Sequence, residues 1–248
     1  MAVRPPWRGI DLEGLALNDT VIGSRSNNFA WLKLIALLLM LFDHASVQYL
    51  RAAHLPDASS MLRLPGRFCI PVFAFLVAYG YVNFSRDRVR YMFRVALVAI
   101  IAEPCYWLCF HDHGNAFIPL ALALLAFVMV DAPGVSKQWM SYVAVAVVAG
   151  LAMLLTRSYE VFLVFAMCIC FRFALERDNA WFLPAFVCAF FCNWPSIATG
   201  VSLFVTFTMI VVAAYGNLAM PPLRIPKSVA YLFYPGHLLF LALFAQGR

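Results

Sequence analysis

Two ionisable residues stand side by side in the first long apolar stretch of the chain. Asp43 and His44 lie in the segment 29–51, which reads FAWLKLIALLLMLFDHASVQYLR. A charged group at membrane depth costs at least about 2.5–3.5 kcal/mol, so an ionisable residue there indicates a functional site. Neighbours on a helix point about 100° apart, so the pair can flank one cavity while each finds its partner on another helix. The other interpretation is a hydrogen-bonded pair that only ties helices together.

A second histidine occurs in the last apolar stretch, YLFYPGHLL, residues 231–239. His237 follows Pro235 and Gly236, which loosen a helix at that point. The unperturbed imidazole pKa is near 6.5, so a neutral ring can still accept a proton. We expect His44 or His237 to act as a general base, with Asp43 orienting whichever imidazole it reaches. These three residues form the predicted catalytic set.

Further polar residues in or beside apolar segments are predicted to contact a substrate. Arg67 follows a glycine at the start of the second segment, and its guanidinium suits carboxylate or phosphate groups. Glu103 precedes a proline within the third segment and needs a partner, for which Arg67 is the expected candidate. Asn115 is expected either to contact substrate or to cap the fourth helix. The predicted binding set is Lys33, Arg67, Glu103, Asn115 and Tyr234. The side chain of Lys33 can alternatively extend to the membrane surface, and no metal site is predicted.

Composition predicts the elements that must hold these residues. The chain of 248 residues is 64% hydrophobic and only 12% charged, and its mean hydropathy is +0.84. Soluble domains average about 25% charged residues. We therefore expect an all-α, polytopic transmembrane helix bundle with eight or nine spans. The expected spans are 29–50, 68–84, 91–110, 116–132, 139–156, 159–175, 180–192, 197–215 and 228–245, of which the seventh is short.

The distribution of basic residues predicts the orientation of this bundle. With nine spans, twelve of the 18 Lys and Arg lie on the side of the N-terminus, five lie on the opposite side, and Lys33 lies within the first span. This bias favours a cytoplasmic N-terminus. Residues 1–28 lack the apolar core of a signal peptide and are expected to form a cytoplasmic tail, followed by one integral domain, 29–248. Because the basic residues sit in short loops, a nucleic-acid partner is not expected.

Three segments of the chain resemble the TraX family of conjugative plasmids. They are LKLIALLLMLFDHAS at 32–46, LPGRFCIPVFAFLVAYGY at 64–81 and FYPGHLLFLALF at 233–244. Their order and spacing also fit that family, whose members are polytopic inner-membrane proteins. The chain departs from it where Tyr159-Glu160 replaces a common Tyr-Gly pair.

This resemblance implies an activity, a donor and partners. It implies a multi-pass acetyltransferase of the bacterial inner membrane that acetylates the N-terminus of processed pilin with acetyl-CoA. Lys33 and Arg67 would then hold CoA phosphates or pilin carboxylates. The implied partners are the pilin subunit, the lipid bilayer and components of a conjugative type IV secretion system. Two alternatives stay open, namely a pilin-processing peptidase or cyclase and a non-enzymatic scaffold for pilin assembly.

Overall fold

The computed structural model describes residues 18–52, 65–83, 87–111, 114–132, 138–156, 159–192, 197–215 and 220–246, and within these ranges it contains helices and no strand. The described part holds nine α-helices, one for each predicted segment, so the all-α class is confirmed. They are α1 (Asn18–Ala52), α3 (Cys69–Asn83), α4 (Arg88–Phe110), α5 (Phe117–Val130), α6 (Gln138–Thr156), α7 (Tyr159–Glu176), α8 (Phe182–Cys192), α9 (Ile197–Tyr215) and α10 (Lys227–Gln246). Short 3-10 turns, η3 (Pro65–Phe68) and η4 (Asn179–Trp181), precede α3 and α8.

The first helix extends further than hydropathy predicted. The apolar stretch begins at Phe29, whereas α1 begins at Asn18, so the last part of the expected N-terminal tail is helical. A helix continues through polar residues as long as none of them breaks its hydrogen bonding, and hydropathy does not report this. The rest of the expected tail, residues 1–17, lies outside the described residues. The short seventh segment is confirmed as the eleven-residue helix α8.

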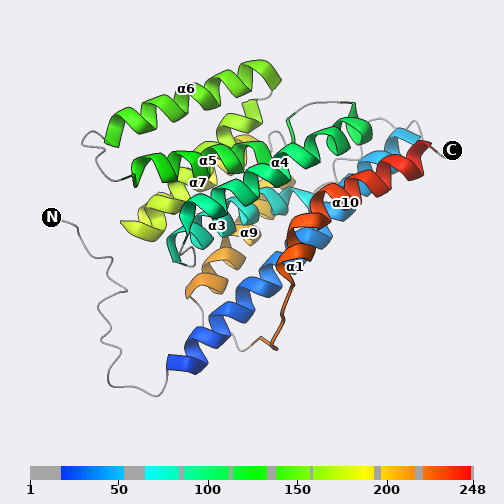
Figure 1. Ribbon diagram of the computed structural model, residues 1–248. Helices are drawn as coiled ribbons and strands as arrows, with labels where there is room; N and C mark the ends of the chain where they lie inside the picture. Colours follow the sequence, from blue (N-terminus) through cyan, green and yellow to red (C-terminus); the bar gives the residue numbers. More distant parts are fainter. Residues whose placement is uncertain are drawn as a thin grey trace.

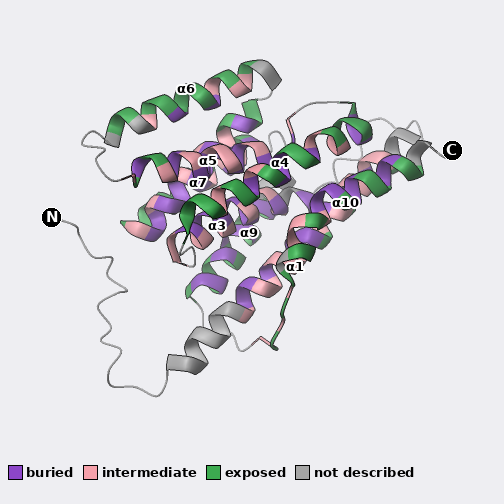
Figure 2. Cartoon of the chain, in the orientation of Figure 1, coloured by how far each residue is buried: buried purple, intermediate pink, exposed green. Residues whose placement is uncertain are grey.

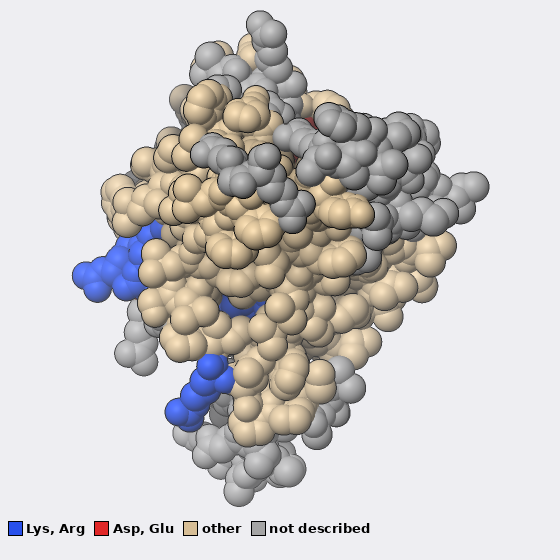
Figure 3. All heavy atoms as spheres, turned by 90° about the vertical axis from the view of Figure 1, so that its right-hand side faces the viewer, with Lys and Arg blue, Asp and Glu red and all other residues tan. Residues whose placement is uncertain are grey.

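Helix length and surface composition indicate which parts of the bundle could lie in a membrane. Segments Asn27–Tyr49 and Arg88–Phe110 are long and apolar enough to cross a bilayer by themselves, whereas the other apolar helices in the described part are shorter. Large apolar side chains cover the outside, among them Ile100, Leu154 and Phe204, which are 71%, 69% and 68% exposed. In Figure 3 most of the coloured surface is uncharged, and basic side chains appear at a few places, chiefly at one side and near the lower edge. The number of spans stays a prediction.

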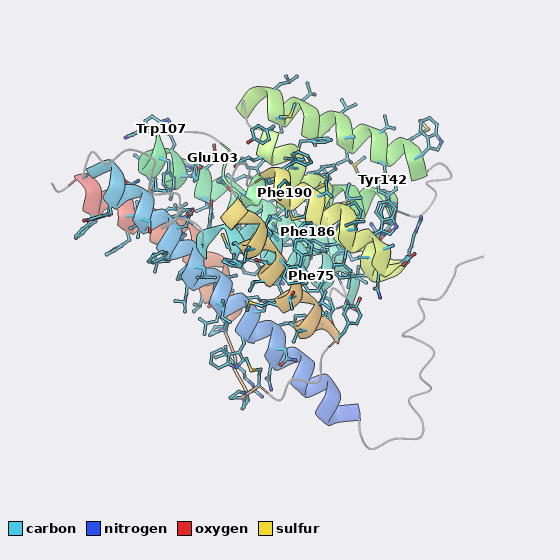
Figure 4. All side chains as sticks on the ribbon, turned by 180° about the vertical axis from the view of Figure 1, so that it is seen from behind. Phe75, Glu103, Trp107, Tyr142, Phe186 and Phe190 are labelled. Carbon is cyan, nitrogen blue, oxygen red and sulfur yellow. The ribbon has the colours of Figure 1, made fainter. Side chains whose placement is uncertain are left out.

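The helices are arranged so that α1 and α10 lie side by side, with α4 packed along α10 (Figure 1). Helices α3, α5 and α7 form the interior, and α6 lies on the outside against α5 and α7, where most of its surface is exposed (Figure 2). Aromatic residues fill the centre. Phe75, which is fully buried, contacts Phe29, Phe171 and Phe182. Figure 4 labels Phe75 on α3 and, on α8, Phe186 and Phe190, which follow the contact residue Phe182 along that helix.

A charged network joins four helices at one end of the bundle, and the sequence analysis did not predict it. Arg172 on α7 is 5% exposed and donates from Nη2 to Asp131 Oδ1 at 2.5 Å and from Nε to Glu176 Oε2 at 3.0 Å. Asp131 Oδ2 accepts from Arg88 Nη1 at 2.6 Å and from the Tyr81 hydroxyl at 2.9 Å. Because each charge is hydrogen-bonded to an opposite charge, the buried Arg172 is tolerated.

Candidate functional site

A cavity of about 330 Å³ opens between the helices at the end of the bundle away from this network. Its walls come from the C-terminal halves of α1 and α4, the N-terminal ends of α3, α5 and α7, and the middle of α10. Tyr81, for comparison, lies about 18 Å along α3 from Cys69 in the cavity wall, at 1.5 Å per residue. The volume falls at the low end of the range for ligand pockets, about 300–1,000 Å³. The polar side chains in its wall are Asp43, His44, Cys69, Tyr106, Glu160 and Tyr234.

The two histidines predicted separately from the sequence are directly hydrogen-bonded. His44 Nδ1 on α1 and His237 Nε2 on α10 are 2.7 Å apart, and the two rings are inclined by only 11°. His44 lines the cavity, and His237, which is 7% exposed, lies behind it. Phe110 and Tyr234 contact the His44 ring edge-on, and Phe233 stacks on His237. The sequence left open which histidine reaches the site, and the structure brings both together as one dyad.

The hydrogen bonds of the dyad determine its protons. His237 Nδ1 lies 2.7 Å from the carbonyl oxygen of Phe233, which can only accept, so Nδ1 carries the proton. In a neutral ring, His237 Nε2 then holds the lone pair and accepts from Nδ1–H of His44. The neutral dyad therefore places its remaining basic nitrogen on His44 Nε2. Both nitrogens of His237 are engaged in this way, and the orientation of an imidazole by Asp43 stays a prediction.

Asp43 is held in the cavity wall by a close contact with the backbone of η3. It is 9% exposed, and Gly66 packs directly against its side chain. A Cβ atom added at Gly66 would overlap Asp43 Cβ and lie 2.8 Å from Oδ1. The Cys69 thiol donates to the Gly66 carbonyl oxygen at 2.7 Å, which anchors η3 to the start of α3. Only glycine permits this approach, so two of the segments that resemble the TraX family meet at this point.

Glu103 and Asn115 hold the ends of α4 and α5 together at the cavity. Glu103 accepts from the backbone N–H groups of Gly114 and Asn115 at 3.0 and 3.1 Å and from Asn115 Nδ2 at 2.6 Å. Asn115 is fully buried, donates also to the Ala99 carbonyl at 2.9 Å and accepts from the Phe117 N–H at 2.9 Å. Asn115 thus binds the first backbone N–H of α5 from the position before the N-cap residue, Ala116, which makes no side-chain capping bond. Figure 4 shows Glu103 on α4, one turn before the half-exposed Trp107. Direct contact of Glu103 or Asn115 with substrate stays a prediction.

The remaining predicted binding residues occupy different places. Tyr234 is 1% exposed and lines the cavity, where its hydroxyl oxygen accepts from the Ala116 N–H at 3.4 Å. Lys33 lies about 15 Å along α1 from Asp43, toward the opposite end of the bundle. The side chain of Arg67 lies outside the described residues, so its pairing with Glu103 stays a prediction.

Two cavity residues were missed by the sequence analysis. Tyr106 and Glu160 line the cavity from α4 and α7. Tyr106 follows Glu103 by three residues, and this helical spacing was the available signal for a shared face. Glu160 lies in the first turn of α7, where an acidic residue is common and draws no attention. Among the described residues, no group of three His, Cys, Asp or Glu side chains is arranged to hold a metal ion.

Comparison with known proteins agrees with the segments that carry the resemblance. No curated protein and no solved structure matches the chain significantly. The family model described as TraX protein matches residues 28–245, which is nearly the whole chain and includes the dyad, Asp43 and Gly66. The chain therefore belongs to the TraX family, and membership implies a membrane protein involved in the processing of pilin for conjugative pili.

Proposed function

We propose that this protein is a multi-pass acetyltransferase of the bacterial inner membrane that acetylates the N-terminus of conjugative pilin with acetyl-CoA. The observation that carries the proposal is the His44–His237 hydrogen bond of 2.7 Å at the wall of the cavity. A partly buried imidazole pair with a defined tautomer, of which one ring lines the cavity, is a suitable general base. Family membership, which points to a role in pilin processing, supports pilin as the acceptor.

The dyad accounts for the proton transfers of an acetyl transfer to an amine. The amine nitrogen attacks the thioester carbonyl carbon, forming the C–N bond, while His44 Nε2 takes the proton that the nitrogen loses. His44 then carries a positive charge, and His237 stabilises it by accepting from Nδ1–H. When the C–S bond breaks, the leaving thiolate receives this proton and departs as the thiol. His44 is the catalytic residue in this scheme, and His237 is a positioning residue.

The developing oxyanion needs a donor in the same cavity. Tyr234 is suited to this role because its oxygen already accepts from the Ala116 N–H, which leaves its hydroxyl proton to be donated elsewhere. Phe117 packs against the Tyr234 ring with centroids 4.6 Å apart and limits its movement. One well-placed donor to an oxyanion contributes about 10²–10³ in rate.

The cavity and the expected orientation fit two substrates that arrive from different sides. The volume of 330 Å³ accommodates an acetyl group and a terminal amine, so the nucleotide part of acetyl-CoA must lie outside it. In the proposed orientation Lys33 lies toward the cytoplasm, about 15 Å from Asp43 along α1, a distance that a long thioester arm can bridge. Lys33 and Arg67 are proposed to hold the phosphates, and the processed pilin N-terminus enters from the periplasmic side.

The test is the intact mass of the cognate pilin from cells that contain the protein, lack it, or contain His44→Phe. We expect a gain of about 42 Da, one acetyl group, only with the unsubstituted protein. An unchanged mass in all three samples would overturn the proposal and favour a scaffold, which should tolerate loss of His44. A loss of about 18 Da or a shortened chain would instead indicate a cyclase or a peptidase.

A further inference from the structure

We infer that the inner part of this cavity binds an aliphatic acyl chain, and that the protein transfers butyryl groups as well as acetyl groups. The inference rests on the proposed function, which places the thioester carbonyl of the donor beside His44 and Tyr234. It extends that function to a further class of donor, the short-chain acyl thioesters, and it gives a role to lining residues that have had none.

The lining of the cavity changes from polar to apolar with depth. Asp43 on α1, Cys69 on α3 and Glu160 on α7 line its outer part. Three or four residues farther into the bundle, each of these helices presents an apolar side chain to the cavity, and α5 adds a fourth. These residues, which we call the cavity floor, are Met40, Phe73, Leu120 and Val164.

The course of the helices shows that the floor lies inside the bundle. Helices α3, α5 and α7 run from the cavity toward the charged network at the other end, and α1 runs the opposite way, with Phe29 against Tyr79 near the end of α3. Met40, Leu120 and Val164 are only 3%, 2% and 3% exposed. One helical turn beyond the polar residues adds a depth of about 5 Å, which is enough for a few methylene groups.

The groups attached to the reacting carbonyl differ in where they end. The sulfur is attached to the long carrier arm and the attacking nitrogen to the pilin chain, and both continue out of a cavity of about 330 Å³. The acyl chain ends inside it. An acetyl group has only a methyl group beyond the carbonyl, whereas a butyryl group has two further methylene groups that can pack on the floor. The longer donor reacts by the same steps, because the C–N bond forms, the C–S bond breaks and the proton held by His44 leaves on the thiol.

The size of the expected effect follows from apolar burial. Each buried methylene should raise kcat/KM about fourfold, so the unsubstituted protein should use butyryl-CoA about 15-fold better than acetyl-CoA. A floor that only packs the bundle together predicts something else, since substitutions there would change stability and leave the choice of donor unaltered. Val164→Phe, which fills the floor, should therefore lose the preference for butyryl.

The experiment measures kcat/KM of the purified full chain with acetyl-, butyryl- and hexanoyl-CoA and two synthetic peptides that begin with glycine or leucine. Val164→Phe should remove the preference for butyryl over acetyl. Leu120→Ala, which deepens the floor, should shift the preference toward hexanoyl. Val147→Phe makes the same change as Val164→Phe on the outer surface of α6, where Val147 is 56% exposed, and should keep the preference of the unsubstituted protein.

Three results would overturn the inference. The first is an unsubstituted protein that uses butyryl-CoA no better than acetyl-CoA. The second is an unaltered choice of donor in both Val164→Phe and Leu120→Ala. The third is a Val164→Phe variant that changes the choice between the two peptides and not between the donors, because the floor would then bind the first side chain of the acceptor.

A binding measurement separates the failure of this inference from the failure of the proposed function. S-acetyl and S-butyryl N-acetylcysteamine, which are thioesters without a nucleotide, are titrated against each protein by isothermal calorimetry. If no acyl group of any length is transferred, the proposed function fails. Tighter binding of the S-butyryl compound that is lost in Val164→Phe and kept in Val147→Phe would still support the acyl site, whereas equal affinity for the two thioesters would overturn it.

Discussion

The dyad predicts that His237 acts through His44, and His237→Phe tests this most directly. Phenylalanine keeps the ring volume and removes both nitrogens. His44 Nδ1 then loses the acceptor that lies 2.7 Å away. His44 itself is not substituted and still lines the cavity. His237→Gln is the conservative partner, since its side-chain oxygen can accept where Nε2 did.

The expected loss of rate follows from two contributions. A buried N–H without an acceptor costs about 1–3 kcal/mol, so in His237→Phe the proton of His44 moves to Nε2 and the reactive tautomer must be regained at that cost. Hydrogen bonds to a charged ring are worth about 1 kcal/mol more than those to a neutral ring, and this stabilisation of the transition state is also lost. Together they amount to about 2–4 kcal/mol, which lowers kcat by about 30-fold to 1,000-fold.

The assay compares acetylation rates of pilin by intact mass for the unsubstituted protein, His237→Phe, His237→Gln, His44→Phe and the double phenylalanine variant. We expect His237→Gln to recover at least about tenfold of the lost rate. The double variant should be no slower than His44→Phe, because the residues act as one unit. His111→Asn serves as control, since His111 lies in the left-handed region at φ 56°, which asparagine tolerates, and does not line the cavity.

Three results would refute this reasoning. The first is a His237→Phe rate within about threefold of the unsubstituted protein, which corresponds to less than 1 kcal/mol. The second is a His237→Gln variant as slow as His237→Phe, which would show that an acceptor opposite His44 Nδ1 does not restore the rate. The third is a double variant whose loss equals the product of the two single losses, as expected for residues that act independently.

Three further predictions concern the elements around the dyad. Gly66→Ala forces a Cβ into the side chain of Asp43, so it should abolish acetylation and destabilise the protein by about 1–3 kcal/mol. Gly150→Ala, whose added Cβ would have nothing within 4 Å, should not lower the Tm. Arg172→Ala removes the buried guanidinium that binds Asp131 and Glu176, while Asp131 keeps Arg88, so it should lower stability by about 1–3 kcal/mol, measured by thermal unfolding in detergent. The exposed Arg177→Ala should change stability little. Asn115→Ala removes buried hydrogen bonds to Ala99, Glu103 and Phe117 and should lower the Tm by an amount equivalent to about 1–3 kcal/mol; an unchanged Tm would contradict the role assigned to it.

Local chemistry explains why some features were predictable from the sequence. The helices follow from apolar stretches separated by polar and proline-containing turns, and nine segments were located in this way. A local role of Asn115 at the start of α5 was predictable because such a side chain binds backbone N–H groups within a few residues of its own position. Boundaries were less predictable, as the early start of α1 shows, because hydropathy reports burial rather than helix continuity.

Contacts between distant helices were decided by packing alone. His44 and His237 are separated by 193 positions, and no local pattern specifies that one ring donates to the other. The network around Asp131 and Arg172 escaped notice for the same reason, since each residue alone resembles a charge at the end of a helix. The sequence by itself determined the helices, the family and the residues capable of chemistry. The tertiary structure decided which of them meet, because a hydrogen bond of 2.7 Å depends on how α1 and α10 pack, and the packing of two helices is a property of the whole bundle.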